Sequence, residues 1–319
     1  MIAVVIPCYR GAKTILGVIN DIPSCVDKIY VVDDACPEQS GQIVLDANLG
    51  PRVEVLFHPK NRGVGGAMIT GFRAAVNGNA EILVKVDSDG QMDCRLIPWL
   101  VKPIKENRAD FAKGNRFFNL NVIQEMPKAR LFGNAILSFV NKASSGYWDI
   151  MDPTNGFFAI HRKILRMIPI EKLDQGYFFE SDLLFRLGSL RTAVVDIPMD
   201  AKYFFGGVSS MSLTRVAFQF PVKYAVRIFK RLFYNYFLRD FNIGSLSIVI
   251  AAVGLSWAIG FGGYEWLLSL NHGLIATSGT VMLAGLPVIL SGIALVVFFV
   301  VDFLSVPKIA IHTSIPDWY

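Results

Sequence analysis

The chain has 319 residues, of which 53% are hydrophobic and only 18% are charged, and its formal net charge is +5. An ordinary soluble domain has about 25% charged residues, so this composition excludes a disordered or fibrous chain and argues against a purely soluble protein. The four cysteines form no CxxC pair, which gives neither a disulfide framework nor a zinc site and favours a reducing compartment.

The first ninety residues alternate short apolar runs with helix-like stretches. The apolar runs predict strands at 2–6, 28–32, 53–57 and 82–86. The stretches between them predict helices at 12–21, 39–48 and 65–77. This alternation is typical of a mostly parallel sheet with helices on both faces. In such sheets, ligands bind beyond the carboxyl ends of the strands.

Polar residues follow three of these four strands at that end. After the fourth strand, Asp87 and Asp89 flank Ser88, and both carboxylates can turn toward one divalent cation. Gln91 adds an amide oxygen, and hard oxygen ligands of this kind suit Mg²⁺ or Mn²⁺. At the neighbouring strand end, Asp33 and Asp34 can bind the polar edge of a nucleoside. The alternative for both acidic segments is a surface turn.

A glycine-rich segment occupies residues 61–67, Asn-Arg-Gly-Val-Gly-Gly-Ala. It is not a dinucleotide fingerprint, because Met68 stands where the last glycine is required and the segment follows the third strand rather than the first. A dehydrogenase therefore stays only as an alternative. The glycines still permit close backbone approach to a phosphate or sugar at the start of a helix.

Residues 203–242 carry six basic residues and one acid. Lys223, Arg227, Lys230 and Arg231 recur on one helical face. The opposite face is filled by Val222, Ala225, Val226, Phe229, Phe233 and Phe237. This pattern predicts an amphipathic helix lying in the headgroup layer of a membrane. The alternative is a helix packed on its own globular domain; no motif for nucleic acid accompanies the charge.

Two uncharged stretches follow, at 243–263 and 273–301, and the linker between them, whose only ionisable residues are Glu265 and His272, predicts a short turn. Each exceeds the roughly 20 apolar residues that a helix needs to cross a bilayer, so two transmembrane helices are predicted, with a pair of buried core helices as the alternative. Basic residues before the first span, with Lys308 and His312 after the second, place both termini, and with them the N-terminal domain, in the cytoplasm. Nothing at the N-terminus suggests export, so we expect a multi-pass protein of the inner (plasma) membrane.

Four segments in this order resemble family-2 inverting glycosyltransferases of the GT-A fold: residues 5–9, 31–34, 61–67 and 87–91. The closest resemblance is to the polyprenyl-phosphate branch, which includes dolichol-phosphate mannose synthase and bacterial undecaprenyl-phosphate sugar transferases. It covers nearly the whole chain. It implies a GT-A catalytic domain at 1–212, amphipathic interface helices at 213–242, two transmembrane helices at 243–306 and a cytoplasmic tail at 307–319.

The resemblance also implies roles for single residues. The donor would be bound by Pro7, Tyr9, Asp34, Asn61, Gly63, Gly65, Asp87 and Ser88. The metal would be held by Asp87, Asp89 and Gln91, and the lipid phosphate by Arg116, Arg130 and Asn134. Catalysis would rest on Asp89, Arg116, Arg130 and Asp182. Residues 153–157 would shape the acceptor and sugar pocket.

Two positions depart from the pattern of the family. Related bacterial enzymes often carry Ser-Lys-x-Ser before the interfacial helix, where this chain has Ser-Ser-Met-Ser at 209–212, and Lys202 is a candidate substitute for the missing lysine. Asp182 matches the general base of relatives that glycosylate hydroxyl groups. A lipid phosphate is already an anionic nucleophile and hardly needs a base, so Asp182 would instead orient Arg116 or Arg130, or contact the sugar.

The implied enzyme is a hexosyltransferase that moves a sugar, with inversion, from a nucleotide-sugar donor, most simply a UDP-sugar, to polyprenyl phosphate with the help of Mg²⁺ or Mn²⁺. One alternative is transfer to a glycan or lipid hydroxyl with Asp182 as base. Another is a non-catalytic membrane scaffold of the same fold. A processive synthase lacks support, because no Gln-x-x-Arg-Trp occurs. The expected partners are the nucleotide-sugar, polyprenyl phosphate and the bilayer. Nucleic acid is not an expected partner, and the sequence is compatible with a homo-oligomer.

Overall fold

The computed structural model describes residues 1–118, 128–200, 213–273 and 275–316, and the side chains of 128–131 and 213–218 are not among the described parts. Lys202 and the segment 209–212 therefore lie outside the described residues. The chain divides into two compact units. The first unit comprises Met1–Ile228 together with Pro307–Tyr319, and the second unit comprises Phe229–Val306.

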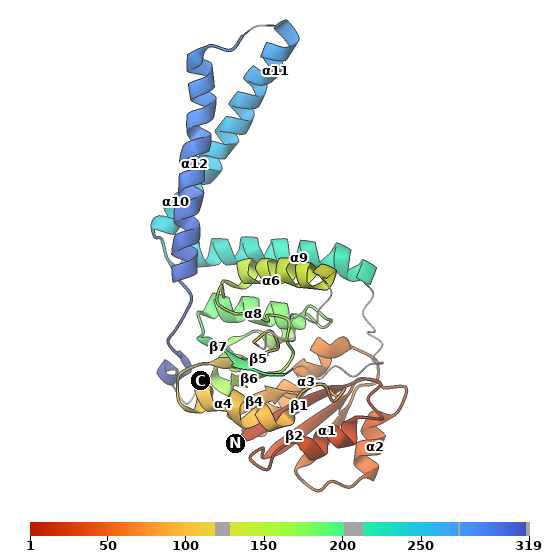
Figure 1. Ribbon diagram of the computed structural model, residues 1–319. Coiled ribbons are helices and arrows are strands. Elements are labelled where there is room, and N and C mark those ends of the chain that lie inside the picture. The colour runs from red at the N-terminus through yellow and green to blue at the C-terminus, as the bar shows by residue number, and fades with distance from the viewer. Residues whose placement is uncertain (119–127, 201–212, 274, 317–319) are drawn as a thin grey trace. The chain divides into compact units, whose positions relative to one another are not determined.

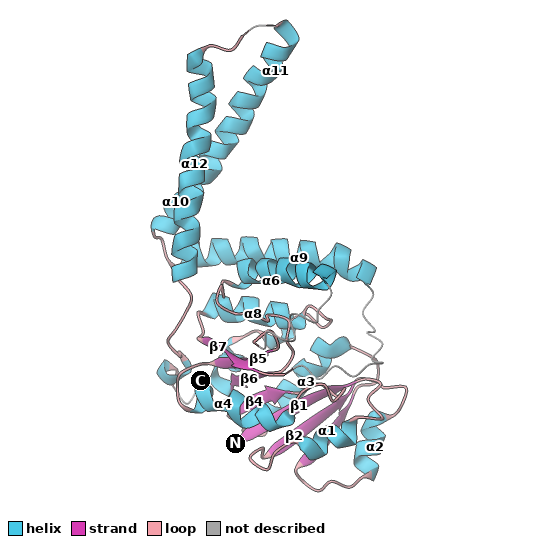
Figure 2. Cartoon of the chain, viewed as in Figure 1, coloured by secondary structure: helices cyan, strands magenta, loops and turns pink. Residues whose placement is uncertain are grey.

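A seven-stranded sheet forms the centre of the first unit (Figure 2). Its strands are β1 (Ile2–Cys8), β2 (Lys28–Asp33), β3 (Val53–Phe57), β4 (Ile82–Lys85), β5 (Phe111–Asn115), β6 (Phe158–His161) and β7 (Val194–Pro198). Their spatial order is β3-β2-β1-β4-β6-β5-β7. Only β6 runs antiparallel to its neighbours. The predicted mostly parallel α/β sheet is confirmed, and its four expected strands are present with ends shifted by at most two residues.

Helices cover both faces of this sheet (Figure 1). The helices that begin in the first unit are α1 (Ile15–Asp21), α2 (Ser40–Asp46), α3 (Gly63–Asn77), α4 (Ile97–Lys105), α6 (Lys128–Ser145), α7 (Arg162–Met167), α8 (Phe179–Leu190) and α9 (Leu213–Phe233), whose last residues belong to the second unit. Every residue of β1 is buried, as a parallel strand covered on both sides requires. Its side chains alternate between the two layers, because Val4 packs in one core cluster with residues of α1 and α4, whereas its neighbour Val5 lies against α3.

The last residues of the chain belong to the first unit. Asp110, directly before β5, is fully buried, and its carboxylate accepts hydrogen bonds from the backbone N–H groups of Ala193, Ile311 and His312. The His312 ring donates a further bond from Nδ1 to Asp110 (2.7 Å) and stacks on the ring of His161. The chain thus leaves the first unit after residue 228 and is fastened to it again after residue 306.

Two long helical stretches make up most of the second unit. The first runs through α10 (Ile243–Trp257), a π-helical turn (Ala258–Gly262) and α11 (Gly263–His272). The second is α12 (Ser278–Leu304). Both are long and apolar enough to cross a membrane. Their most apolar stretches are only 22% and 17% buried, so core helices of a soluble protein do not describe them.

The structure differs from the sequence-based expectation between these helices. The sequence indicated a turn around Glu265, but the first helix continues through that residue to His272 and ends at Gly273, whose φ is +62°. Near the other end of the second unit, a buried ion pair joins Arg231 to Asp302 (2.7 Å), and the hydroxyl of Tyr236 donates to the same carboxylate. A buried carboxylate in an apolar helix needs such partners.

Candidate active site

Acidic side chains lie just past β4, at the carboxyl edge of the sheet. Asp87 is partly buried, and its Oδ1 accepts a hydrogen bond from the Lys85 ammonium (2.6 Å). Asp89 is exposed, and its Oδ1 accepts the backbone N–H of Gln91 (2.9 Å). The three predicted metal ligands therefore share one turn, which the positive φ of Gly90 (+75°) allows.

Lys85 is a buried charge that the sequence analysis overlooked. Its side chain is 1% exposed, and its Nζ lies 3.1 Å from Oε1 of Glu180, in the first turn of α8, as well as contacting Asp87. Burial alone lowers the pKa of Lys85, but the carboxylates of Asp87 and Glu180 raise it overall, so the ammonium stays charged. The signal for it was a lysine inside the apolar run 82–86, because a charge in a buried strand must be paired.

The side chains after β4 supply oxygen atoms of the kind that binds a divalent cation, and a metal at this turn stays a prediction. Although the Asp89 side chain is exposed, partial desolvation of its carboxyl group and, to a smaller extent, the like charge of Asp87 raise its pKa, while the N–H of Gln91 opposes the shift. A cation between two such carboxylates relieves this repulsion, and Mg²⁺ and Mn²⁺ favour oxygen donors. Among the described residues, no group of three or more His, Cys, Asp or Glu side chains is placed to hold a metal ion. Two carboxylates suit an ion whose remaining positions are filled by substrate phosphates and water.

Gly156 leaves the room that this ion-pair cluster needs. A Cβ at this position would collide with the Lys85 ammonium and lie 3.0 Å from Oδ2 of Asp87. We therefore expect Gly156→Ala to lower the free energy of unfolding by about 1–3 kcal/mol, as other overpacked interiors do. Gly17→Ala is the matched control: it has nothing within 4 Å and should be neutral or stabilising by about 0.5–1 kcal/mol. Denaturant midpoints of the purified protein measure both; equal midpoints for the two variants would contradict the packing argument.

Asp34, a predicted nucleoside ligand, is 3% exposed and is occupied by internal donors. Its Oδ1 accepts hydrogen bonds from His58 Nδ1 (2.6 Å) and the N–H of Arg62 (2.8 Å), and its Oδ2 accepts the N–H of Gly63 (2.8 Å). The Asn61 amide donates to the Asp34 carbonyl (3.2 Å). Asp34 thus orders the loop that leads into α3. A direct contact with a nucleoside stays a prediction.

The other predicted donor residues are placed as follows. Pro7 and Ser88 are buried near the ends of β1 and β4, whereas Tyr9, the residue after β1, is 41% exposed. Gly63 and Gly65 lie against the backbone of the loop 174–176, and a Cβ on Gly65 would collide with a backbone carbonyl oxygen of that loop. Their small size therefore serves a close backbone approach, here to a segment of the chain itself; an approach to phosphate stays a prediction.

Arg116 follows β5 at the same edge of the sheet and forms a bidentate ion pair with Asp152. Its Nε lies 2.8 Å from Oδ2 and its Nη2 lies 3.0 Å from Oδ1. Asp152 is fully buried, whereas the Arg116 side chain is 33% exposed. Burial alone raises the pKa of Asp152, but the hydrogen bond from Arg116 and the charge of Lys113 lower it overall. The expectation that Asp182 orients Arg116 is not met: Asp152, directly before the segment 153–157, is the partner, and the sequence analysis did not name it.

The remaining acceptor residues lie on α6. Arg130 is in its first turn, and the Arg130 side chain is outside the described part of the chain. Asn134, one turn later, is half-buried. Farther along the helix, Asn141 is fully buried and donates to Ser181 (2.8 Å). The opposite side of α6 is apolar and exposed at Phe132 (69%), Ile136 (51%) and Phe139 (57%). This helix turns amide groups inward and aromatic groups outward, the reverse of a helix on a soluble protein.

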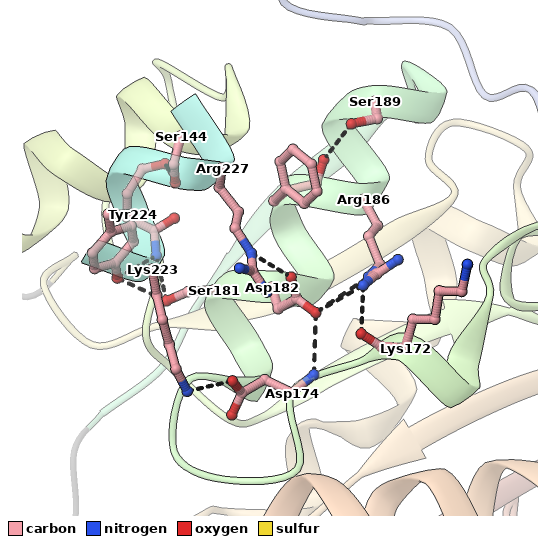
Figure 3. A network of polar contacts seen from close by, with 12 residues as sticks. Ser144, Lys172, Asp174, Ser181, Asp182, Arg186, Ser189, Lys223, Tyr224 and Arg227 are labelled. Atoms are coloured by element: carbon pink, nitrogen blue, oxygen red, sulfur yellow. Dashed lines mark hydrogen bonds and ion pairs between the residues drawn. The ribbon is translucent and has the colours of Figure 1, made fainter. Parts of the chain in front are cut away.

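Asp182 lies on α8 within a network of charges (Figure 3). Its Oδ1 accepts a hydrogen bond from Arg227 Nε (2.9 Å), and its Oδ2 accepts bonds from Arg186 (3.2 Å) and from the backbone N–H of Asp174 (3.1 Å). The side chain is fully buried. Through these hydrogen bonds Asp182 connects α8 to the loop at 174 and to α9. Its role as a base stays a prediction.

Two residues of the basic face of α9 form ion pairs inside the first unit. Lys223 pairs with Asp174, and Arg227 pairs with Asp182. The other face is exposed, at Val222 (65%) and Val226 (39%). In Figure 1, α9 runs beside α6, and the Tyr224 hydroxyl accepts a hydrogen bond from Asn141 (3.2 Å). The sequence predicted that the basic face contacts lipid headgroups. In the structure, Lys223 and Arg227 instead hold α9 against α8 and the loop at 174, and the apolar face of α9 is exposed.

Comparison with known proteins gives a consistent result. Residues 3–168 match the family described as glycosyl transferase family 2. A UDP-N-acetylglucosamine–dolichyl-phosphate N-acetylglucosaminyltransferase of Methanococcus voltae is 26% identical over 217 residues, covering 64% of this chain and 86% of the relative. An undecaprenyl-phosphate mannosyltransferase of Micrococcus luteus is 29% identical, covering 61% and 81%. A dolichol-phosphate mannosyltransferase of Pyrococcus furiosus is 25% identical, covering 62% and 55%.

Among solved structures, glucosyl-3-phosphoglycerate synthase from Mycobacterium tuberculosis, in complex with Mn²⁺, UDP and phosphoglyceric acid, is similar to this chain. The TM-score is 0.53 at 19% identity, and the match covers 72% of this chain and 78% of the synthase. At this identity the likeness concerns the fold, which is the GT-A-like arrangement expected from the sequence.

Proposed function

Because this chain belongs to glycosyl transferase family 2, we propose that it transfers a sugar from a nucleotide-sugar to a polyprenyl phosphate at a membrane surface. The relatives named above support this acceptor, since their names specify dolichyl or undecaprenyl phosphate. A UDP-sugar is the proposed donor, in line with the name of the Methanococcus voltae relative.

The observation that carries the proposal is the reversed polarity of α6. The helix that follows Arg116 and contains Arg130 and Asn134 exposes Phe132, Ile136 and Phe139. An exposed apolar stripe of this kind is stable in the interfacial region of a bilayer, where it contacts acyl chains rather than water. The adjacent α9 also exposes its apolar face. An acceptor site on such a helix would receive a phosphate that is attached to a lipid.

The proposed reaction is a single in-line displacement. An oxygen of the polyprenyl phosphate attacks C1 of the sugar, and the bond from C1 to the nucleotide diphosphate breaks with its electron pair leaving on the diphosphate. The attacking oxygen is already anionic, so no proton has to be removed. Asp87, Asp89 and Gln91 would hold a divalent cation, which supplies Lewis-acid neutralisation of the leaving group when bound. Arg116 would orient the acceptor, because its planar fork matches phosphate oxygens.

The two apolar helices would hold the active site beside its lipid substrate. Residues on both sides of them, up to 228 and from 307 onward, belong to one compact unit. Both flanks must then lie on the same side of a membrane, so the two helices would cross it once in each direction. Basic residues lie before the first of these helices and after the second. Their position and the shared side of the two flanks support a cytoplasmic first unit at the inner membrane.

The alternative acceptor is a hydroxyl group with Asp182 as general base. The Asp182→Asn variant separates the two. With a phosphate acceptor, we expect transfer per folded molecule to show the same pH dependence as the unchanged protein, because no base acts on the acceptor. Since Asp182 faces Arg186 and Arg227, stability will fall, and the folded fraction must be measured beside the initial rate. A large rate loss that is rescued at high pH would favour the hydroxyl acceptor.

A panel of labelled nucleotide-sugars tests the proposal as a whole. Membranes containing the protein are incubated with each donor and with polyprenyl phosphate. We expect one donor to place its label in an organic-soluble product that is released by mild acid, as a glycosyl phosphate is. Membranes carrying the Asp89→Ala variant provide the blank. Absence of such a product with every donor would overturn the proposal.

A further inference from the structure

A buried lysine lies three residues before Arg116 and is not used by the reaction described above. Lys113 belongs to β5, it is 1% exposed, and its Nζ has no hydrogen-bond partner among the described residues. Lysine is almost never fully buried unless it is paired, and a charge left alone in the interior is costly. A lysine in this position therefore requires an anionic partner, which it contacts in another state of the enzyme.

Charged groups surround Lys113 on several elements. They are Asp152 before β6, Asp196 on β7, Arg116 after β5 and Glu180 on α8. Burial lowers the pKa of Lys113 to about 8, the charges of Asp152 and Asp196 oppose this shift, and Arg116 adds to it. The amine therefore changes charge within the pH range of ordinary assays.

Among the carboxylates around Lys113, Asp152 is the one that the loss of its cationic partner would destabilise most. It is fully buried, and both of its oxygens are held by Arg116. Arg116 is one-third exposed and is the arm that would reach the acceptor phosphate. When its guanidinium turns to that phosphate, Asp152 loses both hydrogen bonds from the side chain, keeps only the bond from the backbone N–H of Arg116 (3.2 Å), and stays behind as a buried negative charge without a cation. Such a charge, left without compensation, would oppose the movement.

We propose that Lys113 is a positioning residue that neutralises Asp152 when Arg116 turns to the acceptor phosphate. The proposal rests on the function proposed above, in which Arg116 binds a lipid phosphate. It explains why the lysine is buried beside an ion pair and bonded to neither member. In the state described here, Arg116 occupies both oxygens of Asp152; in the acceptor-bound state, Lys113 takes its place.

Asp196 is a competing partner for Lys113 and has to be distinguished. One oxygen of Asp196 accepts bonds from Asn115 (3.1 Å) and from the N–H of Met151 (2.9 Å), and its Oδ1 has no partner among the described residues. However, Asp196 is partly exposed, and desolvation raises its pKa. Asp152 is the more deeply buried charge, and its pKa is lowered. Asp152 is therefore the stronger electrostatic partner of the Lys113 ammonium.

Equilibrium binding of polyprenyl phosphate to the full-length protein tests this inference, with the KM of the acceptor as a second measurement. Lys113→Met should fold, because an apolar side chain of similar length replaces a buried charge. We expect it to weaken acceptor binding about tenfold and to leave the KM of the donor unchanged. In an Asp152→Asn background the same change should have no further effect, since no buried charge is left to neutralise. Lys102→Met, at an exposed lysine on α4, is the control.

The pH profile gives a readout that a purely structural lysine would not move. Acceptor binding by the unchanged protein should weaken above pH 8, where Lys113 loses its proton, and Lys113→Met should remove this alkaline limb. Unchanged binding in Lys113→Met, or an effect that persists in full with Asp152→Asn, would overturn the inference. So would an effect that is abolished by Asp196→Asn instead. Failure to form any glycolipid would refute the proposed function, whereas the binding measurement would still decide the role of Lys113.

Discussion

Replacing Asp89 by alanine is expected to lower the rate of sugar transfer by about 10³-fold, because the loss of a metal ligand removes several kcal/mol of stabilisation from the departing diphosphate. Asp89 is exposed and makes its one described hydrogen bond to the N–H of Gln91, so the fold should tolerate the change. The measurement is the initial rate of glycolipid formation over a range of Mn²⁺ concentrations.

Asp93→Ala is the matched control for this variant. Asp93 lies four residues farther along, caps the short helix at 94–96 and pairs with Arg95. The control removes the same functional group from the same loop region without touching the proposed ligand set, and its rate should stay close to that of the unchanged protein. If Asp89→Ala kept its rate and its dependence on Mn²⁺, the assignment of the metal to this turn would be wrong.

The Arg116→Ala variant is expected to lower kcat/KM for the acceptor by about 10²-fold or more, since removing one partner of a hydrogen-bonded charge pair costs roughly 2–5 kcal/mol. Arg116→Lys should recover only part of this loss, because a lysine keeps the charge but cannot donate two parallel bonds to a phosphate. The KM of the nucleotide-sugar should stay nearly constant in both variants. Kinetics with varied polyprenyl phosphate at saturating donor measure these effects.

Arg73→Ala provides the comparison for the loss of an arginine. Arg73 lies on α3 and pairs with Glu171 at the surface, where both side chains are about half exposed. Surface pairs contribute at most about 1 kcal/mol, so neither rate nor affinity should change. The folded fraction of Arg116→Ala has to be measured as well, because this variant leaves Asp152 buried without its partner. An equal loss of kcat/KM per folded molecule in Arg73→Ala and Arg116→Ala would contradict a specific role of Arg116 in acceptor binding.

The parts of the fold that follow from local patterns were predictable from the sequence. β1, β2 and β4 are short, largely apolar runs, as strands buried on both faces require, whereas β3 is a partly exposed strand at the edge of the sheet whose apolar residues still marked it. The two long apolar helices follow from length and composition in the same way. The end of the first one was misjudged, because the sequence around Glu265 is polar enough for a turn and yet continues the helix to His272.

The partners of the site residues were not predictable, because they are distant in the sequence. Arg116 meets Asp152, 36 positions away, and Lys85 meets Glu180 on α8. Only the tertiary packing brings these pairs together, and no periodicity in the sequence records it. The basic residues of α9 show the same limit. Their helical spacing indicated one charged face correctly, but it could not tell that Asp174 and Asp182 stand opposite that face.

The account is tested most directly by offering the enzyme two acceptors that differ only in the phosphate. Polyprenyl phosphate and the corresponding polyprenol are incorporated at equal density into vesicles that contain the protein, and transfer from the labelled donor is followed over time. We predict label in the glycosyl phosphate lipid and none in a polyprenyl glycoside. Transfer to the polyprenol at a comparable rate would contradict the assignment of an anionic acceptor that Arg116 receives and that no base has to activate.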